Sequence, residues 1–290
     1  MRRFIFITII IISLYDVSAQ IRIESGGAPD PVRLRQKAIY DSAQVTVFYD
    51  YGCAEPPING SPSRKYSEVI LLIGDKYLGT MDWRSFQMDS INDDYYLNKR
   101  GTADDLLMMF FNNESLHPAY KYPVVVDLNK NEAILVVSTS MTGYRYRQSL
   151  PRIEWKLENE EKKIKGIRCL KATCRFGGRD WTAWYAPEYA MPYGPYLFNG
   201  LPGLIMQVVD KKKNFAFKFK GIERCNPKRC IYLEMSKTLD TTREKAREAV
   251  KNFNKDPMKA LIDGGAVKVP KGSPLGNISS SIPYNSIELE

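Results

Sequence analysis

Short runs of alternating apolar and polar residues, separated by turn-forming residues, dominate this chain and limit the folds open to it. The clearest run is "FAFKFKG" (215–221), and "QVTVFYDY" (44–51) has the same pattern. A period of two puts apolar side chains on one face of a strand and polar ones on the other. Strands of this kind joined by short turns predict an antiparallel sheet with one buried face.

Further strands are predicted at 67–82, 122–149, 152–187 and 204–225. A turn at Gly74-Asp75 divides the first of these segments, and "DLNKNE" (127–132) makes a hairpin turn in the second. The segment "CAEPPINGSPSRK" (53–65) is dense in Pro, Gly and Ser and predicts a loop.

Helical patterns are confined to two places. "TADDLLMMFFNN" (102–113) begins with Thr102 as a cap, and the charges of Asp104 and Asp105 favour a helix N-terminus. "DTTREKAREAVKNFNKDPMKALIDGG" (240–265) predicts two short helices after the strands end. Because the helices are clustered, the predicted class is α+β: a mainly antiparallel, curved sheet with a short helical insertion and C-terminal helices.

The first residues, "MRRFIFITIIIISLYDVSAQ", predict a secretory signal peptide at 1–19. Two arginines precede an apolar run that is shorter than the ~20 residues of a spanning helix, and small residues follow at the cleavage position. We therefore expect an exported protein, periplasmic, outer-membrane-associated or extracellular, with no transmembrane segment after cleavage. A single β-rich domain is predicted at 20–267, followed by a loose tail at 268–290.

The formal net charge is +9, and Arg2, Arg3 and Asp16 of the predicted signal leave +8 (9 − 1) on the mature chain. Small basic clusters occur at 162–165, 211–213 and 228–229. Two interpretations stay open: a solvated surface, or an anionic partner such as lipid head groups or lipopolysaccharide. Nucleic acid is not expected as a partner, because the chain carries an export signal.

Five cysteines are disulfide candidates, because an exported chain meets an oxidising compartment: Cys53, Cys169, Cys174, Cys225 and Cys230. A turn within "CNPKRC" predicts a Cys225–Cys230 pair. Cys169 and Cys174 lie five apart, face opposite sides of a strand and need other partners, of which Cys53 is one. The spacing fits no common zinc pattern and the chain has one histidine, so neither a metal nor a cofactor is expected.

The stretch "WYAPEYAMPYGPYLFNGLPGLIMQVV" (184–209) is rich in turn residues and then strongly apolar. Its prolines remove backbone donors, which excludes a central strand before the end of the proline-rich part. Pro202-Gly203 suits a type II turn that leads into a buried strand at Leu204, and the glycines allow two backbones to approach closely. The residues predicted to be structural here, and not reactive, are Gly194, Pro195, Gly200, Leu201, Pro202, Gly203, Leu204, Ile205, Trp181 and Trp184.

The same stretch resembles the signature of the GLPGLI family of secreted Bacteroidetes proteins. The resemblance rests on "GLPGLI" (200–205) within "GGRDWTAWYAPEYAMPYGPYLFNGLPGLI" and extends back through "IEWKL" (153–157) and "IKGIRCLKA" (164–172). The ending "YNSIELE" (284–290) is similar to the family's Asn-Pro-Ile-Glu-Leu ending, with Ser286 in place of proline. The resemblance implies an exported location and a β-rich fold, and it supplies no catalytic residues.

No catalytic residue is predicted from the sequence. His117 beside Cys53 or Cys174 would be a nucleophile–base pair, but a loop histidine and bridged cysteines are the simpler interpretation. Asp180 and Glu188 flank two tryptophans, which is compatible with a carboxylate pair at a sugar platform or with two surface acids. P-loop, GxGxxG, GxSxG and metal-box motifs are absent from the sequence.

Three functional hypotheses therefore remain. The first is non-catalytic binding of an apolar or lipid-like ligand, or of an envelope protein partner, on the concave side of the curved sheet. It is motivated by the aromatic content of 12% and by the soft apolar block at 108–111. The second is an accessory or scaffold role in outer-membrane machinery, and the third is a secreted hydrolase.

Overall fold

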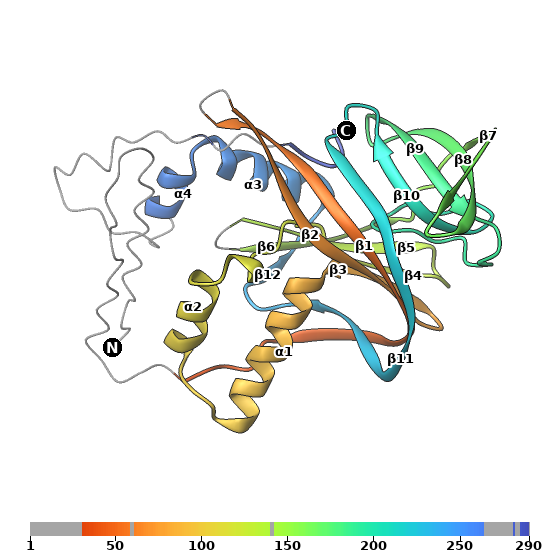
Figure 1. The fold of residues 1–290 in the computed structure, drawn as a ribbon. Coiled ribbons are helices and arrows are strands. Elements are labelled where there is room, and N and C mark those ends of the chain that lie inside the picture. The colour runs from red at the N-terminus through yellow and green to blue at the C-terminus, as the bar shows by residue number, and fades with distance from the viewer. Residues whose placement is uncertain (1–30, 59–60, 140–141, 264–280, 282–284, 290) are drawn as a thin grey trace.

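A computed structural model describes residues 31–58, 61–139, 142–263, 281 and 285–289. The predicted signal peptide lies outside the described residues. Within the described residues, one twelve-stranded sheet forms the framework, in the order β12-β6-β5-β4-β3-β2-β1-β11-β10-β9-β8-β7 (Figure 1). The strands are β1 (Lys37–Ile58), β2 (Ser61–Ile73), β3 (Tyr77–Asp82), β4 (Val124–Asp127), β5 (Glu132–Ser138), β6 (Gly143–Ser149), β7 (Lys156–Ile164), β8 (Ile167–Phe176), β9 (Arg179–Ala186), β10 (Leu204–Asp210), β11 (Phe215–Glu234) and β12 (Thr238–Asp240).

The sheet consists of two series of consecutive antiparallel strands that meet at one seam. Strands β1 to β6 form the first series and β7 to β11 the second, and β1 pairs with β11 at the seam. The turns at Gly74-Asp75 and "DLNKNE" lie between strands, which confirms those two predictions. The last strand, β12, pairs in parallel with β6 and makes the sheet mixed.

The β1–β11 ladder is long and bent. It runs from Lys37 opposite Glu234 to Cys53 opposite Phe215, with three register shifts along the way. Such irregularities bend strands and increase their twist. The outer end of the ladder folds back over β3, and Ile231 of β11 packs directly against Gly79. A Cβ atom at Gly79 would lie only 2.9 Å from Ile231 Cγ2, so the contact requires glycine.

Two apolar cores lie on opposite faces of the sheet. The main core combines inward residues of most strands with the segment after β9, including Leu197, Phe198 and Leu201, each 1% exposed. The smaller core lies between β2–β5, the folded-back end of β11 and the aromatic residues Trp83 and Phe86. Strands β9 and the first part of β11 alternate between buried and exposed positions because one of their faces meets a core, whereas β3, β4 and β5 meet a core on both faces and are buried almost continuously.

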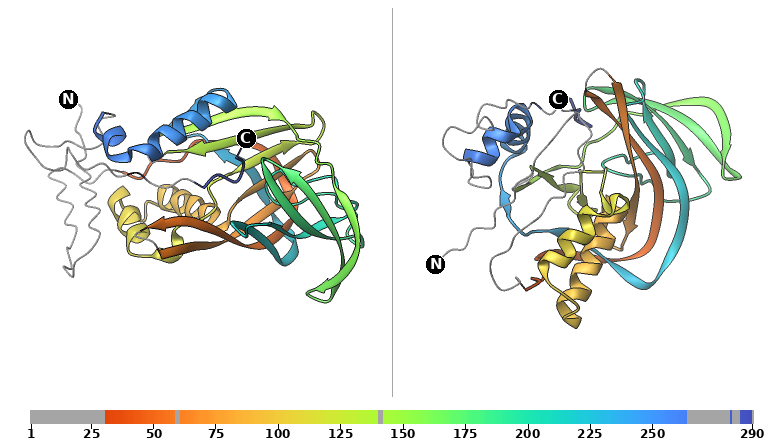
Figure 2. Two further views of the ribbon diagram at one scale, coloured as in Figure 1. Left: turned by 90° about the horizontal axis from the view of Figure 1, so that it is seen from above. Right: turned by 60° about the vertical axis from the view of Figure 1, so that its left-hand side comes forward.

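The first two helices along the chain lie side by side, and the last two lie together at a different place on the sheet (Figure 2). They are α1 (Trp83–Asn98), α2 (Ala103–Phe111), the 3₁₀ turn η1 (Glu114–Leu116), α3 (Arg243–Lys255) and α4 (Pro257–Asp263). Thr102 caps helix α2 as predicted, and Asp105 completes a capping box that was not predicted from the sequence. Thr242 caps α3 in the same way, by accepting a hydrogen bond from the Lys245 amide. Among the described residues, no helix combines the length and apolar character needed to cross a bilayer.

The predicted α+β class is wrong, because the described part of the chain is mostly β, with 50% of its residues in strands and 21% in helices. The strands are longer than the sequence predicts. The segment 53–65, read as a loop, contains the end of β1 and the start of β2, and "CNPKRC" lies inside β11 instead of forming a turn between strands. Long-range pairing with neighbouring strands overrides the local turn signal at both places.

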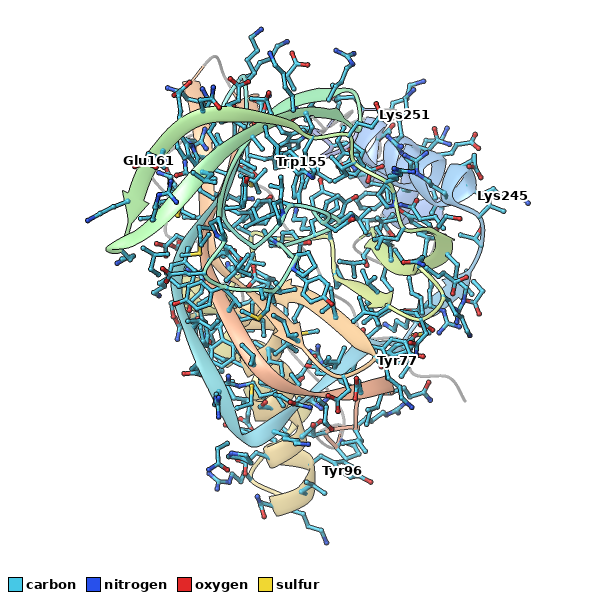
Figure 3. All side chains as sticks on the ribbon, turned by 90° about the vertical axis from the view of Figure 1, so that its right-hand side faces the viewer. Tyr77, Tyr96, Trp155, Glu161, Lys245 and Lys251 are labelled. Carbon is cyan, nitrogen blue, oxygen red and sulfur yellow. The ribbon has the colours of Figure 1, made fainter. Side chains whose placement is uncertain are left out.

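The "GLPGLI" stretch forms a tight turn that leads directly into β10 at Leu204, as predicted. The predicted type II turn is not formed, because Gly203 has a φ of +148° and its amide donates to the Leu201 carbonyl at 2.8 Å, two residues back and not three. A Cβ at Gly203 would lie 2.3 Å from the Ala186 carbonyl oxygen, so two backbones meet here without room for a side chain. Trp155 holds the segment from outside by donating from Nε1 to the Asn199 carbonyl at 2.8 Å (Figure 3).

The described end of the predicted loose tail is packed. Ile287 is 2% exposed within the main core. Arg179 donates to the Ile287 carbonyl at 3.1 Å and the Ser286 carbonyl at 2.5 Å. The Glu288 carboxylate accepts from Tyr196 and, at 2.6 Å, from Arg243. These contacts fix residues 285–289 against the sheet, which corrects the sequence prediction for this part of 268–290.

Gly203→Ala should destabilise the protein more than Gly200→Ala. Gly200 has a φ of +85° but no atom within 4 Å of its Cβ position, so alanine there meets backbone strain alone, about 1–2 kcal/mol. Alanine at Gly203 also meets the Ala186 backbone, which adds about 1–3 kcal/mol. Urea unfolding of both variants measures the difference, and equal losses would contradict the close approach.

Ile287→Ala should lower the unfolding free energy by about 2–5 kcal/mol, because it removes a buried side chain from the main core. Leu289→Ala, two residues away and 59% exposed, is the matched control and should change it by less than about 0.5 kcal/mol. Thermal and urea unfolding of the two variants provides the measurement. Similar, small effects would show that the C-terminal segment is not part of the core.

Candidate functional site

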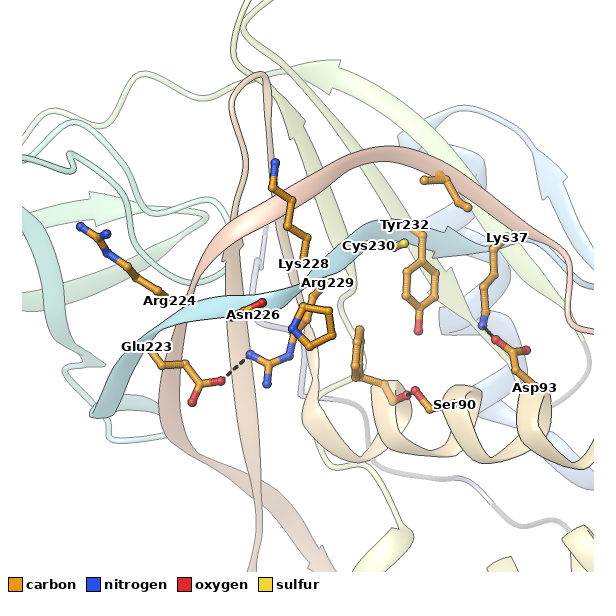
Figure 4. A pocket seen from close by; sticks show the side chains of 13 residues that line it. Lys37, Ser90, Asp93, Glu223, Arg224, Asn226, Lys228, Arg229, Cys230 and Tyr232 are labelled. Carbon is orange, nitrogen blue, oxygen red and sulfur yellow. Dashed lines mark hydrogen bonds and ion pairs between the residues drawn. The ribbon is translucent and has the colours of Figure 1, made fainter.

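A cleft of about 610 Å³ lies between α1 and the middle of β11 (Figure 4). We call it the α1–β11 cleft. Its helix wall carries Phe86, Ser90 and Asp93, and Lys37 of β1 lies at one end. Its β11 wall and rim are formed by residues 223, 224, 226–230 and 232.

A local irregularity in β11 forms the rim. Ala43 of β1 pairs with Arg229, and the next pair along the ladder is Val45 with Arg224. Four residues of β11, 225–228, therefore lie opposite the single residue Gln44. This bulge interrupts the ladder and leaves Arg224 and Lys228 exposed at the rim of the cleft, where their side chains project from β11 away from α1 (Figure 4).

Aromatic and aliphatic side chains line the interior of the cleft. The Phe86 ring stacks on Trp83 with centroids 5.4 Å apart and lies 6.1 Å from the Tyr232 ring. Ile39, at the edge of the cleft, is 64% exposed. An apolar surface thus extends from a rigid aromatic wall to the solvent.

The Lys37 end of the cleft is held by ionic contacts. Lys37 pairs with Asp93 and lies 5.1 Å above the Tyr232 ring. Behind them, the buried Asp89 accepts from the Tyr232 hydroxyl at 2.8 Å and from Arg35 at 2.9 Å. Burial raises the pKa of the Asp89 carboxyl, and the Arg35 charge opposes that rise. These groups form ion pairs and hydrogen bonds with one another and hold the Lys37 end of the cleft in place.

Arg229 is equally fixed on the opposite side. Its Nη1 donates to Glu223 at 2.5 Å and to Thr46 Oγ1 at 2.8 Å. Its guanidinium lies 5.3 Å from the Trp83 ring and 5.8 Å from the Phe48 ring. Guanidinium groups stack in this way on aromatic faces. Arg229 therefore connects the bulge to α1 and is not free for a ligand.

Arg224 and Lys228 differ from the other cations of the cleft. Both are exposed, and neither forms an ion pair with any residue in the described part of the chain. Four cations line the cleft against two acids, Asp93 and Glu223. The two unpaired cations leave the mouth positive, while Phe86, Tyr232 and Ile39 contribute apolar surface to a cleft that is otherwise lined mainly by polar residues.

The tryptophans of the family-like stretch do not form one platform. Trp181 is 2% exposed, its ring lies 4.7 Å from Phe198, and its Nε1 donates to the Phe176 carbonyl. Trp184 faces the other side of β9, beneath the Lys162 ammonium at 4.2 Å. Residues three apart on a strand point in opposite directions.

The carboxylates considered for sugar hydrolysis are also separated. Asp180 lies near the start of β9, 3.6 Å from Arg175, and Glu188 lies beyond its end. The six residue steps of extended chain from Asp180 to the end of β9 at Ala186 span about 20 Å, and a turn that contains Glu188 follows. A glycosidase pair needs carboxylates within about 10 Å. The two acids are therefore too far apart to act together.

His117 has no cysteine partner among the described contacts. Its Nε2 lies 3.0 Å from the Phe110 carbonyl, and its ring lies 4.5 Å from the Phe110 ring. The structure thus does not bring together the residues of a nucleophile–base pair. Among the described residues no cluster of three or more metal-ligating side chains occurs either.

All five cysteines, each of which lies in a described segment, are free thiols. The predicted Cys225–Cys230 disulfide is absent because β11 continues past both residues and does not turn back between them. Cys225 instead lies 2.9 Å from Thr46 Oγ1. Cys169 is buried in the main core, and Cys53 and Cys174 are half-buried beside it.

Comparisons with known proteins give little further information. No family model matches the chain, and no curated protein matches it. Two solved structures of PNGF-II, in space groups P21 and C2, each share 11% identity with it, at TM-scores of 0.47 and 0.45. They cover 72% and 71% of this chain, which spans about a third of their length (33% and 32%). Because both TM-scores lie below 0.5, no conclusion about function follows.

The thiols should differ in their reactivity towards iodoacetamide. Cys230 is exposed and should be alkylated first. Burial, together with the charge of Asp180, raises the pKa of the Cys174 thiol to about 12, and burial also raises that of Cys169, so both should react only after unfolding. Mass spectrometry should count five alkylations in denaturant without reductant. A mass two hydrogens short, with two sites protected, would show a disulfide.

Proposed function

We propose that this chain is an exported protein of the GLPGLI family that binds a ligand and does not catalyse a reaction. The proposed ligand is an anionic amphiphile, and the proposed site is the α1–β11 cleft. The observation that carries the proposal is a cleft of about 610 Å³ in which aromatic and aliphatic surface lies beside a rim with two unpaired cations. That volume lies within the ~300–1,000 Å³ of small-molecule sites.

The proposal moves the site away from the inner face of the sheet. That face, favoured by the sequence pattern, is filled by the protein's own Tyr196, Leu197 and Phe198, which are 4%, 1% and 1% exposed. Close-packed interiors of this kind leave no space for a lipid-like guest. The apolar surface that remains available includes Phe86 and the exposed Ile39 of the α1–β11 cleft.

The charges fit a ligand with one anionic head. Arg229 and Lys37 are neutralised by Glu223 and Asp93. Arg224 and Lys228 are therefore the groups that would meet the head, at the solvent-exposed mouth where its desolvation cost is small. A single acyl or alkyl chain would lie along Phe86 towards Ile39. The exported location rests on the residues 1–19 pattern, and the family on the "GLPGLI" and "NSIEL" stretches.

Isothermal titration calorimetry with dodecyl phosphate, below its critical micelle concentration, tests this proposal. We expect saturable one-to-one binding that weakens at least tenfold in the Arg224→Ala/Lys228→Ala variant, because both head-group contacts are lost. Ile39→Ser should also weaken binding, through the loss of apolar contact. Dodecyl maltoside, which lacks the negative charge, should bind much more weakly.

The control variant is Lys245→Ala/Lys251→Ala. Both lysines project from α3, away from the cleft, and their removal changes the net charge by the same amount (Figure 3). Binding equal to that of the unmodified protein is expected. If dodecyl phosphate does not bind, or if the two double variants lose affinity equally, the α1–β11 cleft is not the site.

A further inference from the structure

We propose a second, separate binding site for an acidic oligosaccharide on the outer face of the sheet. A trough of about 520 Å³ crosses β2, β1, β11 and β10 there. We call it the outer-face trough and define it by Gly52, Ala216 and Val209 along its floor. Neither the proposed amphiphile site nor the family resemblance involves these residues.

The strand register creates the floor. Tyr66 pairs with Gly52, Gly52 with Ala216, and Ala216 with Val209, so the four residues form one line across the sheet. Their sequence neighbours Tyr51 and Phe217 point into the main core. Because successive side chains of a strand point to opposite faces, the residues of this line face outward. A hydrogen atom, a methyl group and an isopropyl group are short side chains, so the surface is hollow along this line.

The trough has the length of about three sugar rings. The four strands that it crosses, about 4.8 Å apart, give about 14 Å between Tyr66 and Val209. The line of paired residues continues beyond the trough to Thr182 of β9. Because the line runs across the strands and does not follow a strand edge, an extended ligand would make side-chain contacts and no added β-strand.

An exposed aromatic ring closes one end of the trough. Tyr66 is 64% exposed, and two of its ring carbons lie 3.2 Å from the Cβ position of Gly52. Arg64 Nη2 lies 3.6 Å from the same point. The ring is therefore seated over the glycine and presents apolar surface to solvent, as amphipathic aromatic residues do at binding surfaces.

Cations border the trough on both sides. Arg64 and Lys213 lie on one side, where Arg64 Nη1 donates to the Lys213 carbonyl at 2.7 Å. Lys218 lies on the other side, in the next line of paired residues. Asp50 is the one acid among the lining residues. Charges spaced along a groove in this way complement a ligand with several negative groups.

The polar groups favour a carbohydrate over a lipid. Gln207 lines the trough beside Val209, and its amide oxygen accepts from Lys162 at 2.8 Å. The Gln207 amide can exchange hydrogen bonds with ligand hydroxyl groups. The shallow floor offers an acyl chain little burial. A chain of sugar rings with carboxylate groups matches the length, the cations, the amide and the open face of Tyr66.

The test is titration calorimetry with a hexamer of galacturonic acid as the acidic oligosaccharide. We expect saturable binding that weakens at least tenfold between about 50 and 300 mM salt, because exposed charges are screened. The neutral maltohexaose should show no measurable binding. The Arg64→Glu/Lys218→Glu variant should lose binding, and Lys245→Glu/Lys251→Glu, with the same charge change on α3, should retain it.

Two further variants separate the parts of the proposal. Gly52→Val would displace the Tyr66 ring while keeping every charge, and should weaken the binding of the hexamer at least fivefold. Arg224→Ala/Lys228→Ala should leave hexamer binding unchanged, because the α1–β11 cleft is a different site. Equal losses of affinity in the outer-face and α3 variants would show that binding depends on net charge alone and not on the trough. Hexaglutamate binding as tightly as the hexamer would overturn the assignment to a sugar.

Discussion

The pairing of β1 with β11 is the interaction on which the rest of the molecule depends. It joins the two antiparallel series, each of which is otherwise a separate sheet with an additional open edge at β1 or β11. Exposed edges carry unpaired backbone groups, so the seam satisfies many donors and acceptors at once. Its register shifts also bend the sheet, which brings Ile231 onto Gly79 and creates the smaller core. The bulge of the α1–β11 cleft and the floor of the outer-face trough are both features of this ladder.

The main core is sealed by segments without regular secondary structure. The chain between β9 and β10 lies over the inner face, and residues 285–289 complete the cover. Burying charged groups is costly unless they are paired and hydrogen-bonded. Arg179 meets this condition through Asp210 and two C-terminal carbonyls, and Glu288 meets it through Arg243 and Tyr196. The contacts of Arg179 and Glu288 hold residues 285–289 against the rest of the main core.

The parts of the fold that depend on local pattern are predictable from the sequence. Alternation places β10 and the first part of β11, the Thr102 cap places α2, and Gly203 marks the turn before Leu204. Helix α1 has no such signal. Its cap, Asp82, accepts from the Arg84 amide, as a local cap does, but also from the Ser67 hydroxyl and two amides at 119 and 120, which only the folded chain brings together.

The candidate sites are harder to predict than the fold, because their residues are distant in the sequence. The cluster at 228–229 is visible as a basic pair, but its aromatic neighbour Phe86 lies on a helix that the pattern does not reveal. The outer-face trough depends on which residues of four strands share a line, and alternation does not fix that register. In contrast, the period of two along a strand is enough to predict that Trp181 and Trp184 point in opposite directions. The sugar-platform hypothesis, which needs both rings on one face, is inconsistent with that period.

The seam also sets a requirement on the way the chain folds. Lys37 pairs with Glu234, 197 positions later (234 − 37). Closing a loop of that length costs about 5 kcal/mol of chain entropy before its contacts contribute anything. A topology with such high contact order folds slowly, and β1 has no partner on one side until almost the whole chain is available. The protein should therefore pass through a long-lived species with an open strand edge, and assistance from a holdase chaperone would matter most during that interval.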